Sequence, residues 1–491
     1  MTDKNTPKPS AGFEKLDELH AKLGKVKGAG VDLTQVEEEI RAALDEVGVE
    51  MMATALRAAD RDELELTVNG MLHSRLHRRR ATIHTTFGAV EVEQTVYGRG
   101  RGQPTVVPME KSLGLVERYY TPKCAKVLCH LTAVVVREEA SELLRELGGI
   151  SVGEATLHRL PLKIMARYER DRDVIEPVLR QRSEVPEAAA TVQVGLDGVM
   201  VPQDGEHCDP RGREPRDGDP DPPRHERAYG AVTPPGPAAV DSKMGVAWHE
   251  ASVGTLAYFD AEGAHLSTVY LGRMPEEKKA TLTEMLQAEA HHALTLRPDL
   301  TALMASDGAW GQWESLAQIT AELPEPARDK AVWLVDFHHV ASHIQDACDV
   351  IDGKGSAAAQ VRRKELCEVL KAYEDGAQRV GQRLRHYRRK ARTERAGEEL
   401  DSVIGYLDNN RARMAYKAAI DRKLPIATGP TEAAAKTLVG VRMKRSGARF
   451  SQHGGQTVLS LRAALKSRRF NDLMDILASS YKATVTNRAA A

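Results

Sequence analysis

The order of hydrophobic patterns between Thr191 and Val335 constrains the fold of this 491-residue chain more than any other feature. Three stretches alternate apolar and polar residues with the period of two that is typical of strands, and short apolar runs then follow between stretches of helical spacing. In chain order these are strands at 191–202, 244–259 and 266–271, a helix at 276–294, a strand at 300–306, a helix at 313–323 and a strand at 331–335. This order predicts an α/β fold.

The segments on either side are mainly helical in pattern. Helical spacing covers 12–76, 122–180 and 340–422, whereas 81–97 alternates with a period of two around Gly88, as in a small hairpin. Within 140–164 a helix ends at Gly148-Gly149 and another opens at Ser151 or Gly153. This is the layout of a helix-turn-helix, and also of an ordinary helical hairpin. Residues 203–239 are rich in Pro, Gly, Asp and Arg, which predicts a loop between two strands.

The composition excludes several classes of protein. The five cysteines are scattered and form no CxxC pair, which argues against a disulfide framework or a zinc ribbon and favours a reducing compartment. No apolar run approaches the roughly 20 residues that span a bilayer, so we expect a cytoplasmic protein without membrane contact. A formal net charge of −1 gives no overall signal for a polyanionic partner, and such binding would require local segregation of charge.

Four acidic residues stand at the expected ends of strands or the start of a helix. They are Asp197 in GLDG, Asp307 in SDGAWGQW, Asp336 in VDFHHV and Glu432 in TGPTEAAAK. Ligands of open α/β sheets gather at the carboxyl ends of the strands, and converging carboxylates suit Mg²⁺, which prefers oxygen ligands together with substrate phosphates. Two such ions can promote in-line phosphodiester chemistry. The alternative for each acid alone is that it caps backbone N–H groups.

Several segments of the chain resemble the DDE transposases of bacterial insertion sequences, with the closest match to the ISKra-type family. The resemblance covers roughly 191–470 and rests on GLDG, SDGAWGQW, VDFHHVASHI, YLDNNRARMAY at 406–416, and LPIATGPTEAAAKTLVGVRMKRSGARF at 424–450. It implies an RNase H-like catalytic core interrupted by an all-helical insertion, preceded by a mainly helical DNA-binding region with a small β-hairpin. The family often carries a cysteine-bearing segment before the core, but residues 96–113 contain no cysteine.

The resemblance also implies roles for individual residues. Asp197 and Glu432 take the first and third catalytic, metal-binding positions, with Mg²⁺ as the cofactor and Mn²⁺ as its substitute. For the second acid we favour Asp307, and Asp336 is the alternative. Asp336 and His339 would otherwise support the site from close by. His339 and His343 lie four residues apart, a spacing that is compatible with binding one metal ion. A histidine that is hydrogen-bonded within the protein or contacts a phosphate is the simpler interpretation of each.

A basic segment follows the third acid. Residues 433–470 hold nine Lys and Arg and no Asp or Glu, an imbalance that favours a surface for DNA phosphates. The candidate DNA-binding residues are Lys436, Arg442, Lys444, Arg445, Arg449, Arg462 and Lys466. Trp310, Trp313 and Trp333 fall near the acids, where core packing is the preferred interpretation and stacking on a flipped base the alternative.

Two functions are therefore compared. The first is a transposase that binds the terminal inverted repeats of its element and joins them to target DNA, acting as a dimer or higher oligomer near the bacterial nucleoid. The second is a catalytically silent DNA-binding protein, a repressor or scaffold, derived from such an enzyme. The expected domains are a helical region at 1–80, the hairpin and helix-turn-helix-like region at 81–185, the first part of the core at 190–339 with a loop at 203–240, the insertion at 340–424, and the last core helices and basic segment at 425–491.

Overall fold

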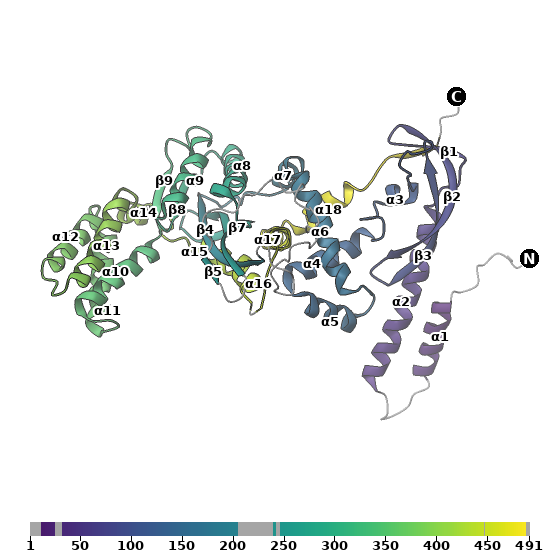
Figure 1. Ribbon diagram of the computed structural model, residues 1–491, viewed down its shortest axis with the longest axis horizontal. Helices are drawn as coiled ribbons and strands as arrows, with labels where there is room; N and C mark the ends of the chain where they lie inside the picture. The colour runs from purple at the N-terminus through teal and green to yellow at the C-terminus, as the bar shows by residue number, and fades with distance from the viewer. Residues whose placement is uncertain (1–10, 25–31, 205–238, 242–245, 446, 488–491) are drawn as a thin grey trace, which may run out of the picture. The chain divides into compact units, whose positions relative to one another are not determined.

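The chain forms two compact units, which we describe one at a time. The computed structural model describes residues 11–24, 32–204, 239–241, 246–445 and 447–487. The first unit comprises Met1–Ile175 with Phe470–Ala491, and the second comprises Glu176–Arg469 (Figure 1). The segment expected at 425–491 is thus divided between them, because α18 (Phe470–Ser479) and β10 (Val485–Asn487) belong to the first unit. The loop expected at 203–240 falls almost wholly outside the described residues.

The first unit begins with two helices and an antiparallel sheet. Asp32 caps the second helix by accepting hydrogen bonds from the N–H groups of Thr34 and Gln35. The strand order is β10-β1-β2-β3, and α2 packs on β3. The elements are α1 (Ala11–Leu23), α2 (Leu33–Ala58), β1 (Glu65–Val68), β2 (Met71–His84), β3 (Ala89–Gly98) and α3 (Pro108–Leu113).

The expectation of helix up to residue 76 is wrong beyond Ala58. Asn69 and Gly70 both adopt positive φ, 49° and 77°, and connect β1 to β2 as a two-residue turn. An Asn-Gly pair between apolar residues is a strong hairpin signal because both positions of such a turn need left-handed backbone. The basic run 73–80 consequently lies on a strand, and the hairpin expected around Gly88 extends that same sheet.

Helices complete the first unit. The two helices that the sequence predicts around Gly148 are present, since α5 ends with Gly148 as its C-cap and α6 begins after Gly153. Both pack on each other, and α18 packs on α4 and α6. The bounds are α4 (Pro122–Val134), α5 (Arg137–Leu147) and α6 (Glu154–Arg170), and α7 (Arg172–Gln181) leads into the second unit.

The second unit is built on a mixed sheet. Its strand order is β5-β6-β4-β8-β9, and β7 also pairs with β6. The pairs β4–β6 and β6–β7 are antiparallel, whereas β4–β8 and β8–β9 are parallel. The strands are β4 (Thr191–Asp204), β5 (Ala239–Asp241), β6 (Val246–Phe259), β7 (His265–Arg273), β8 (Thr301–Ser306) and β9 (Val332–Val335). This α/β order is the one that the hydrophobic pattern predicts.

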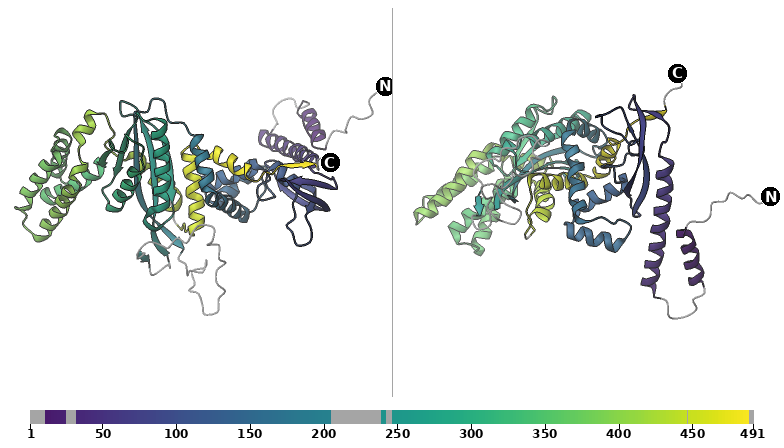
Figure 2. Two further views of the ribbon diagram at one scale, coloured as in Figure 1. Left: turned by 90° about the horizontal axis from the view of Figure 1, so that it is seen from above. Right: turned by 45° about the vertical axis from the view of Figure 1, so that its right-hand side comes forward.

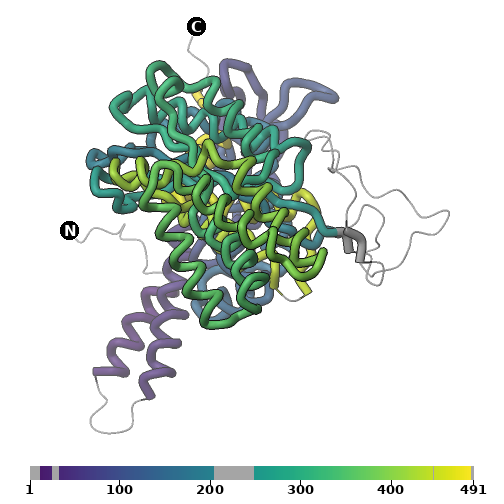
Figure 3. The backbone as a smooth tube through the Cα atoms, turned by 90° about the vertical axis from the view of Figure 1, so that its left-hand side faces the viewer, coloured from purple at the N-terminus to yellow at the C-terminus, as the bar shows by residue number. Residues whose placement is uncertain are grey.

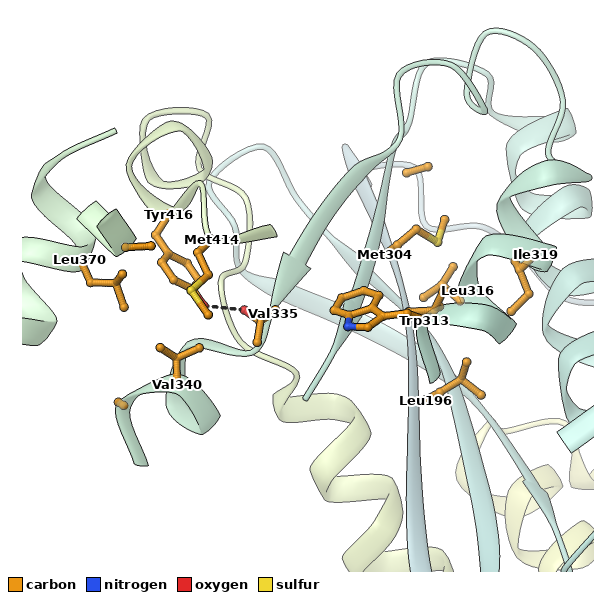
Figure 4. Close-up of a cluster of buried hydrophobic side chains, with 14 of the residues drawn as sticks. Leu196, Met304, Trp313, Leu316, Ile319, Val335, Val340, Leu370, Met414 and Tyr416 are labelled. Atoms are coloured by element: carbon orange, nitrogen blue, oxygen red, sulfur yellow. Dashed lines mark hydrogen bonds between the residues drawn. The ribbon is translucent and has the colours of Figure 1, made fainter. Parts of the chain in front are cut away.

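Helices cover both faces of this sheet (Figure 2). On one face α8 (Ala280–Leu296) and α9 (Trp310–Ala321) pack on the strands, and Figure 4 shows Leu196 and Met304 beside Leu316 and Ile319 of α9. On the other face lie α15 (Gly429–Ala434), the π-helical turn η4 (Ala435–Gly440), α16 (Val441–Met443) and α17 (Gln452–Lys466).

Between β9 and α15 the chain forms a cluster of helices that run alongside one another (Figure 3). They are α10 (Phe337–Asp352), α11 (Ala357–Ala372), α12 (Gly376–Arg388), α13 (Glu394–Asn410) and α14 (Tyr416–Asp421), with a 3-10 turn, η3 (Arg411–Arg413), before α14. Tyr416 attaches the cluster to the sheet by donating to the Val335 carbonyl at 2.9 Å (Figure 4). The helical pattern at 340–422 therefore corresponds to one body of helices.

Two further sequence expectations can be compared with the described part of the chain. Cys124, Cys129, Cys348 and Cys367 are free and buried, and Cys208 lies outside the described residues. No helix among the described residues has the length and apolar character needed to cross a membrane.

Candidate functional site: acidic residues on adjacent parallel strands

The parallel strands place three of the predicted acids, Asp197, Asp307 and Asp336, side by side. Gly195 pairs with Ala305, and Ser306 pairs with Val335. Continuing each register by one or two residues sets Asp197 level with Asp307, and Asp307 level with Asp336. Asp307 and Asp336 directly follow the carboxyl ends of β8 and β9, as the sequence pattern predicts. The expectation that Asp197 also ends a strand is wrong, because β4 continues to Asp204 in its pairing with β6.

Buried Gln312 connects the carboxylate of Asp307 to the backbone of the strand that carries Asp197. With its amide nitrogen turned toward the surrounding acceptors, Gln312 donates to the Leu196 carbonyl at 3.1 Å and to Oδ1 of Asp307 at 2.8 Å. The Oδ1 atom of Asp307 also accepts from the N–H of Ala309 at 2.9 Å, and Oδ1 of Asp197 accepts from Gly198 at 2.7 Å. One oxygen of each carboxylate is thus held by the protein.

The electrostatic environment of Asp197 is that of a crowded acidic site. Burial raises the pKa of the Asp197 carboxyl above its usual value, and the neighbouring charges of Asp307 and Glu250 act in the same direction. The Gly198 N–H and the ammonium of Lys279 lower the pKa and offset part of this effect. A carboxyl raised by desolvation and like charge is common at functional sites.

The helix that carries Glu432 docks directly on β4. Thr431 is buried and its hydroxyl lies 2.7 Å from that of Thr255 on β6. It approaches so closely that a Cβ atom on Gly195 would lie only 2.1 Å from the Thr431 hydroxyl. Gly195 therefore permits the contact that brings the start of α15 to the strand bearing Asp197. Glu432 itself is half exposed and pairs with Lys436 at 3.4 Å.

Asp336 differs from Asp197 and Asp307 because both of its oxygens are occupied. It is buried, and Oδ1 accepts from the N–H of His339 at 2.8 Å, capping α10. Its Oδ2 accepts from the backbone N–H of Thr428 and from the Thr428 hydroxyl, the latter at 2.7 Å. Asp336 thus connects the end of β9 to the residues just before α15.

Two histidines and a tyrosine surround the loop after Asp307. His339 and His343 approach to 3.3 Å between their Nε2 atoms, and the His343 ring packs on Tyr406 with 4.0 Å between centroids. The Tyr406 hydroxyl donates to the backbone carbonyl of Asp307 at 2.8 Å, which ties α13 to the acidic loop. Burial and the neighbouring His339 lower the pKa of His343.

The donor set agrees with a hard cation that keeps part of its water. Asp197 and Asp307 offer only oxygen atoms, and Mg²⁺ is commonly held by one or two carboxylates together with substrate phosphates. Among the residues that the structure describes, no three His, Cys, Asp or Glu side chains are close enough to hold one metal ion. The arrangement therefore presents two neighbouring carboxylates, with Glu432 on an adjacent helix but not grouped with them.

Two residues that the sequence analysis did not single out belong to this site. The carboxylate of Glu250 lies against Gly198, where a Cβ atom would be 1.8 Å from Oε1, and Lys279 donates to that same oxygen at 2.7 Å. Glu250 lies on a strand whose polar positions carry no special signal. Lys279 falls inside the stretch predicted as a helix from residue 276, whereas α8 begins only at Ala280.

The basic segment after Glu432 divides into exposed and buried side chains. Arg442 and Arg462 are buried, and Arg462 donates to the Leu438 carbonyl at 3.0 Å, so these two guanidiniums serve the interior of the unit. Burial also lowers the pKa of Arg462. The exposed members of the predicted set are Lys436, Lys444, Arg445, Arg449 and Lys466. Trp313 is buried, as core packing predicts, whereas Trp310 is exposed.

Comparison with known proteins gives little guidance. Neither a protein-family model nor a curated protein sequence matches this chain. A search of solved structures finds a likeness to the Drosophila P element transposase strand transfer complex, at 14% identity over 74% of this chain and 83% of that one. The TM-score of this superposition is 0.25.

Proposed function

We propose that this chain is a metal-dependent DNA transposase of the DDE class, similar to the ISKra-type family of bacterial insertion sequences. The observation that carries the proposal is the placement of Asp197, inside β4, level with Asp307, which directly follows the parallel strand β8, with the helix of Glu432 docked at Gly195. The strand order β7-β6-β4-β8-β9, with the last two parallel to β4, supports an RNase H-like core. The cluster α10–α14 then corresponds to the helical insertion.

The proposed roles follow from the surroundings of each acid. Asp197 and Asp307 each have one oxygen held by a backbone N–H, which leaves the other oxygen for a cation, and Glu432 would be the third residue to hold it. Mg²⁺, or Mn²⁺ in its place, would supply activation of the attacking oxygen and charge neutralisation at the phosphate. Asp336 supports the site by holding Thr428, which agrees better with positioning than with direct ligation.

The reaction is a pair of in-line displacements. In the first, the oxygen of water attacks the phosphorus, the P–O3′ bond breaks, and the released 3′ oxygen takes up a proton. In the second, that 3′-hydroxyl attacks a target phosphodiester, forming a new P–O bond and releasing a target 3′-hydroxyl. Double-stranded DNA, as terminal repeats and as target, is the proposed partner, and pairing of two ends calls for a dimer or higher oligomer.

Strand cleavage tests the proposal. Asp197→Ala and Glu432→Ala should each abolish Mg²⁺- or Mn²⁺-dependent nicking of a plasmid that carries the DNA flanking the gene, while DNA binding stays within a few-fold of the unmodified chain. Asp307→Asn should do the same. Cleavage by any of these variants contradicts the assignment, and binding without cleavage by the unmodified chain points to the silent DNA-binding protein instead.

A further inference from the structure

The turn that joins β7 to α8 holds two lysines in strained backbone. Lys278 and Lys279 both have positive φ, 53° and 55°, although neither is glycine. Consecutive left-handed residues with side chains cost conformational free energy, and such strain persists where the surrounding structure holds it in place, frequently at functional sites. Only the second of the two lysines is directed into a specific contact in the described structure.

That contact brings a cation to the edge of the acidic site. The Lys279 ammonium donates to Glu250 at 2.7 Å, and the Glu250 carboxylate rests on Gly198, the residue after Asp197. The Lys279 side chain is only 19% exposed, whereas that of Lys278 is in the open. The strained turn therefore places one partly desolvated ammonium beside the first candidate acid.

We infer that Lys279 is a phosphate-binding residue of the site, held ready by Glu250, and that it contacts a non-bridging oxygen of the DNA backbone next to Asp197. This inference rests on the proposed function. A phosphodiester that enters a site with several carboxylates is repelled by their negative charge. The positive charge of a fixed ammonium offsets this repulsion, and because the ammonium acts as a compact point charge, it needs no particular orientation toward the phosphate. The bond to Glu250 keeps the long lysine chain ordered before DNA arrives, which lowers the entropy cost of binding.

The salt dependence of DNA binding tests this role without requiring catalysis. Each phosphate contact adds about 0.9 to the slope of log affinity against log salt for duplex DNA. We expect Lys279→Ala to reduce that slope by about one contact, measured by fluorescence anisotropy with a 40-base-pair labelled duplex in EDTA between 50 and 200 mM salt. Lys279→Arg should restore most of it, because arginine keeps the charge.

Lys278→Ala is the matched control, since it removes a neighbouring lysine from equally strained backbone, and its slope should equal that of the unmodified chain. Glu250→Gln removes the partner and should leave the slope intact. Thermal melting of each variant verifies folding, and if Lys279→Ala melts early it is replaced by Lys279→Gln, which also removes the charge. An unchanged slope in folded Lys279→Ala or Lys279→Gln overturns the inference.

The outcomes separate this inference from the proposed function. A reduced slope in a chain that never cleaves DNA would support Lys279 as a phosphate contact and refute the transposase assignment. Metal-dependent cleavage together with an unchanged slope would support the transposase and show that the Lys279–Glu250 pair is structural.

Discussion

At the scale of single residues, the close approach of backbone and side chain around Asp197 depends on two glycines. Gly195 leaves room for Thr431 of α15, and Gly198 leaves room for the carboxylate of Glu250. Neither position has the positive φ that usually accounts for glycine, so the requirement is for space alone. The GLDG motif lies inside β4, and its two glycines let helix α15 and the carboxylate of Glu250 come close to Asp197.

Replacing Gly195 by alanine tests this requirement. A Cβ atom 2.1 Å from the buried Thr431 hydroxyl forces a shift in a packed interior, which typically costs about 1–3 kcal/mol. We expect Gly195→Ala to lower the free energy of unfolding by that amount in urea denaturation. Gly405→Ala is the control, because a Cβ atom there meets open space within helix α13 and should stabilise by about 0.5–1 kcal/mol. Equal effects at both positions would contradict the packing argument.

The negative charge of Asp197 lowers the stability of the folded chain. Because burial and like charges raise its folded-state pKa above the ordinary 3.8, ionised Asp197 disfavours folding at pH values above that range. Asp197→Asn should therefore raise the melting temperature at pH 7 in EDTA, and the gain should fade as the pH falls below 3.8, where both states are protonated. Scanning calorimetry across pH measures this, and a lower melting temperature at pH 7 would refute it.

At the scale of elements, Asp336 connects three parts of the second unit. It ends β9, caps α10 through His339, and holds Thr428 at the start of α15. A strand, the first helix of the cluster and the helix of Glu432 thus share one buried carboxylate. Tyr406 makes a comparable connection between α13 and the backbone of Asp307. The helices between β9 and α15 are consequently connected to the sheet both at Asp336 and at Asp307.

Exchanging this carboxylate for an amide should loosen the connection. In Asp336→Asn one carboxylate oxygen is replaced by an NH₂ group, which donates and cannot accept. This NH₂ would face the N–H of either His339 or Thr428. One charge-assisted hydrogen bond, worth about 1.5–3 kcal/mol, is therefore lost. We expect a loss of stability of that size in urea denaturation. Asp32→Asn is the control, because exposed Asp32 only caps α2 and asparagine caps nearly as well. A loss of unfolding free energy no larger than in Asp32→Asn would show that the hydrogen bonds from Thr428 to Asp336 do not stabilise the fold.

At the scale of the whole molecule, the near-zero net charge is a sum over unlike regions. The basic segment at 433–470 contains no acid, while Asp197, Asp307 and Asp336 gather on neighbouring parallel strands of the sheet. Burial of Arg442 and Arg462 removes part of the apparent basic surface, and the exposed cations of the predicted set are Lys436, Lys444, Arg445, Arg449 and Lys466. A local surface for a polyanion is therefore compatible with a formal charge of −1.

Reversing two exposed charges tests that surface. If Lys444 and Arg445 contact phosphates, the double variant Lys444→Glu with Arg445→Glu should weaken binding to duplexes of any sequence and reduce the salt slope by about two contacts of 0.9 each. Anisotropy titrations at several salt concentrations provide the measurement. Lys330→Glu, at an exposed position outside the segment, should change the slope little; an equal reduction there would indicate a non-specific effect of net charge.

Much of the element order followed from local pattern. Alternation with a period of two marked β4, β6 and β7, and the parallel strands β8 and β9 appeared as short apolar runs ending at Asp307 and Asp336. Such patterns work because the side chains of a strand alternate between two faces and those of a helix recur every 3.6 residues. The hairpin at Asn69-Gly70 was missed although its signal was present, since helical spacing upstream was extended too far.

The sequence by itself determined the strand-end positions of Asp307 and Asp336, because each follows its own hydrophobic run, whereas Asp197 lies inside the longer strand β4. Only the tertiary structure decided their different surroundings. Register and packing set Asp307 level with Asp197, buried Asp336 against Thr428, and brought Glu250 and Lys279 to Gly198. These contacts join residues far apart in the chain. Their geometry depends on strand pairing and on the space that glycines leave, which no local periodicity encodes.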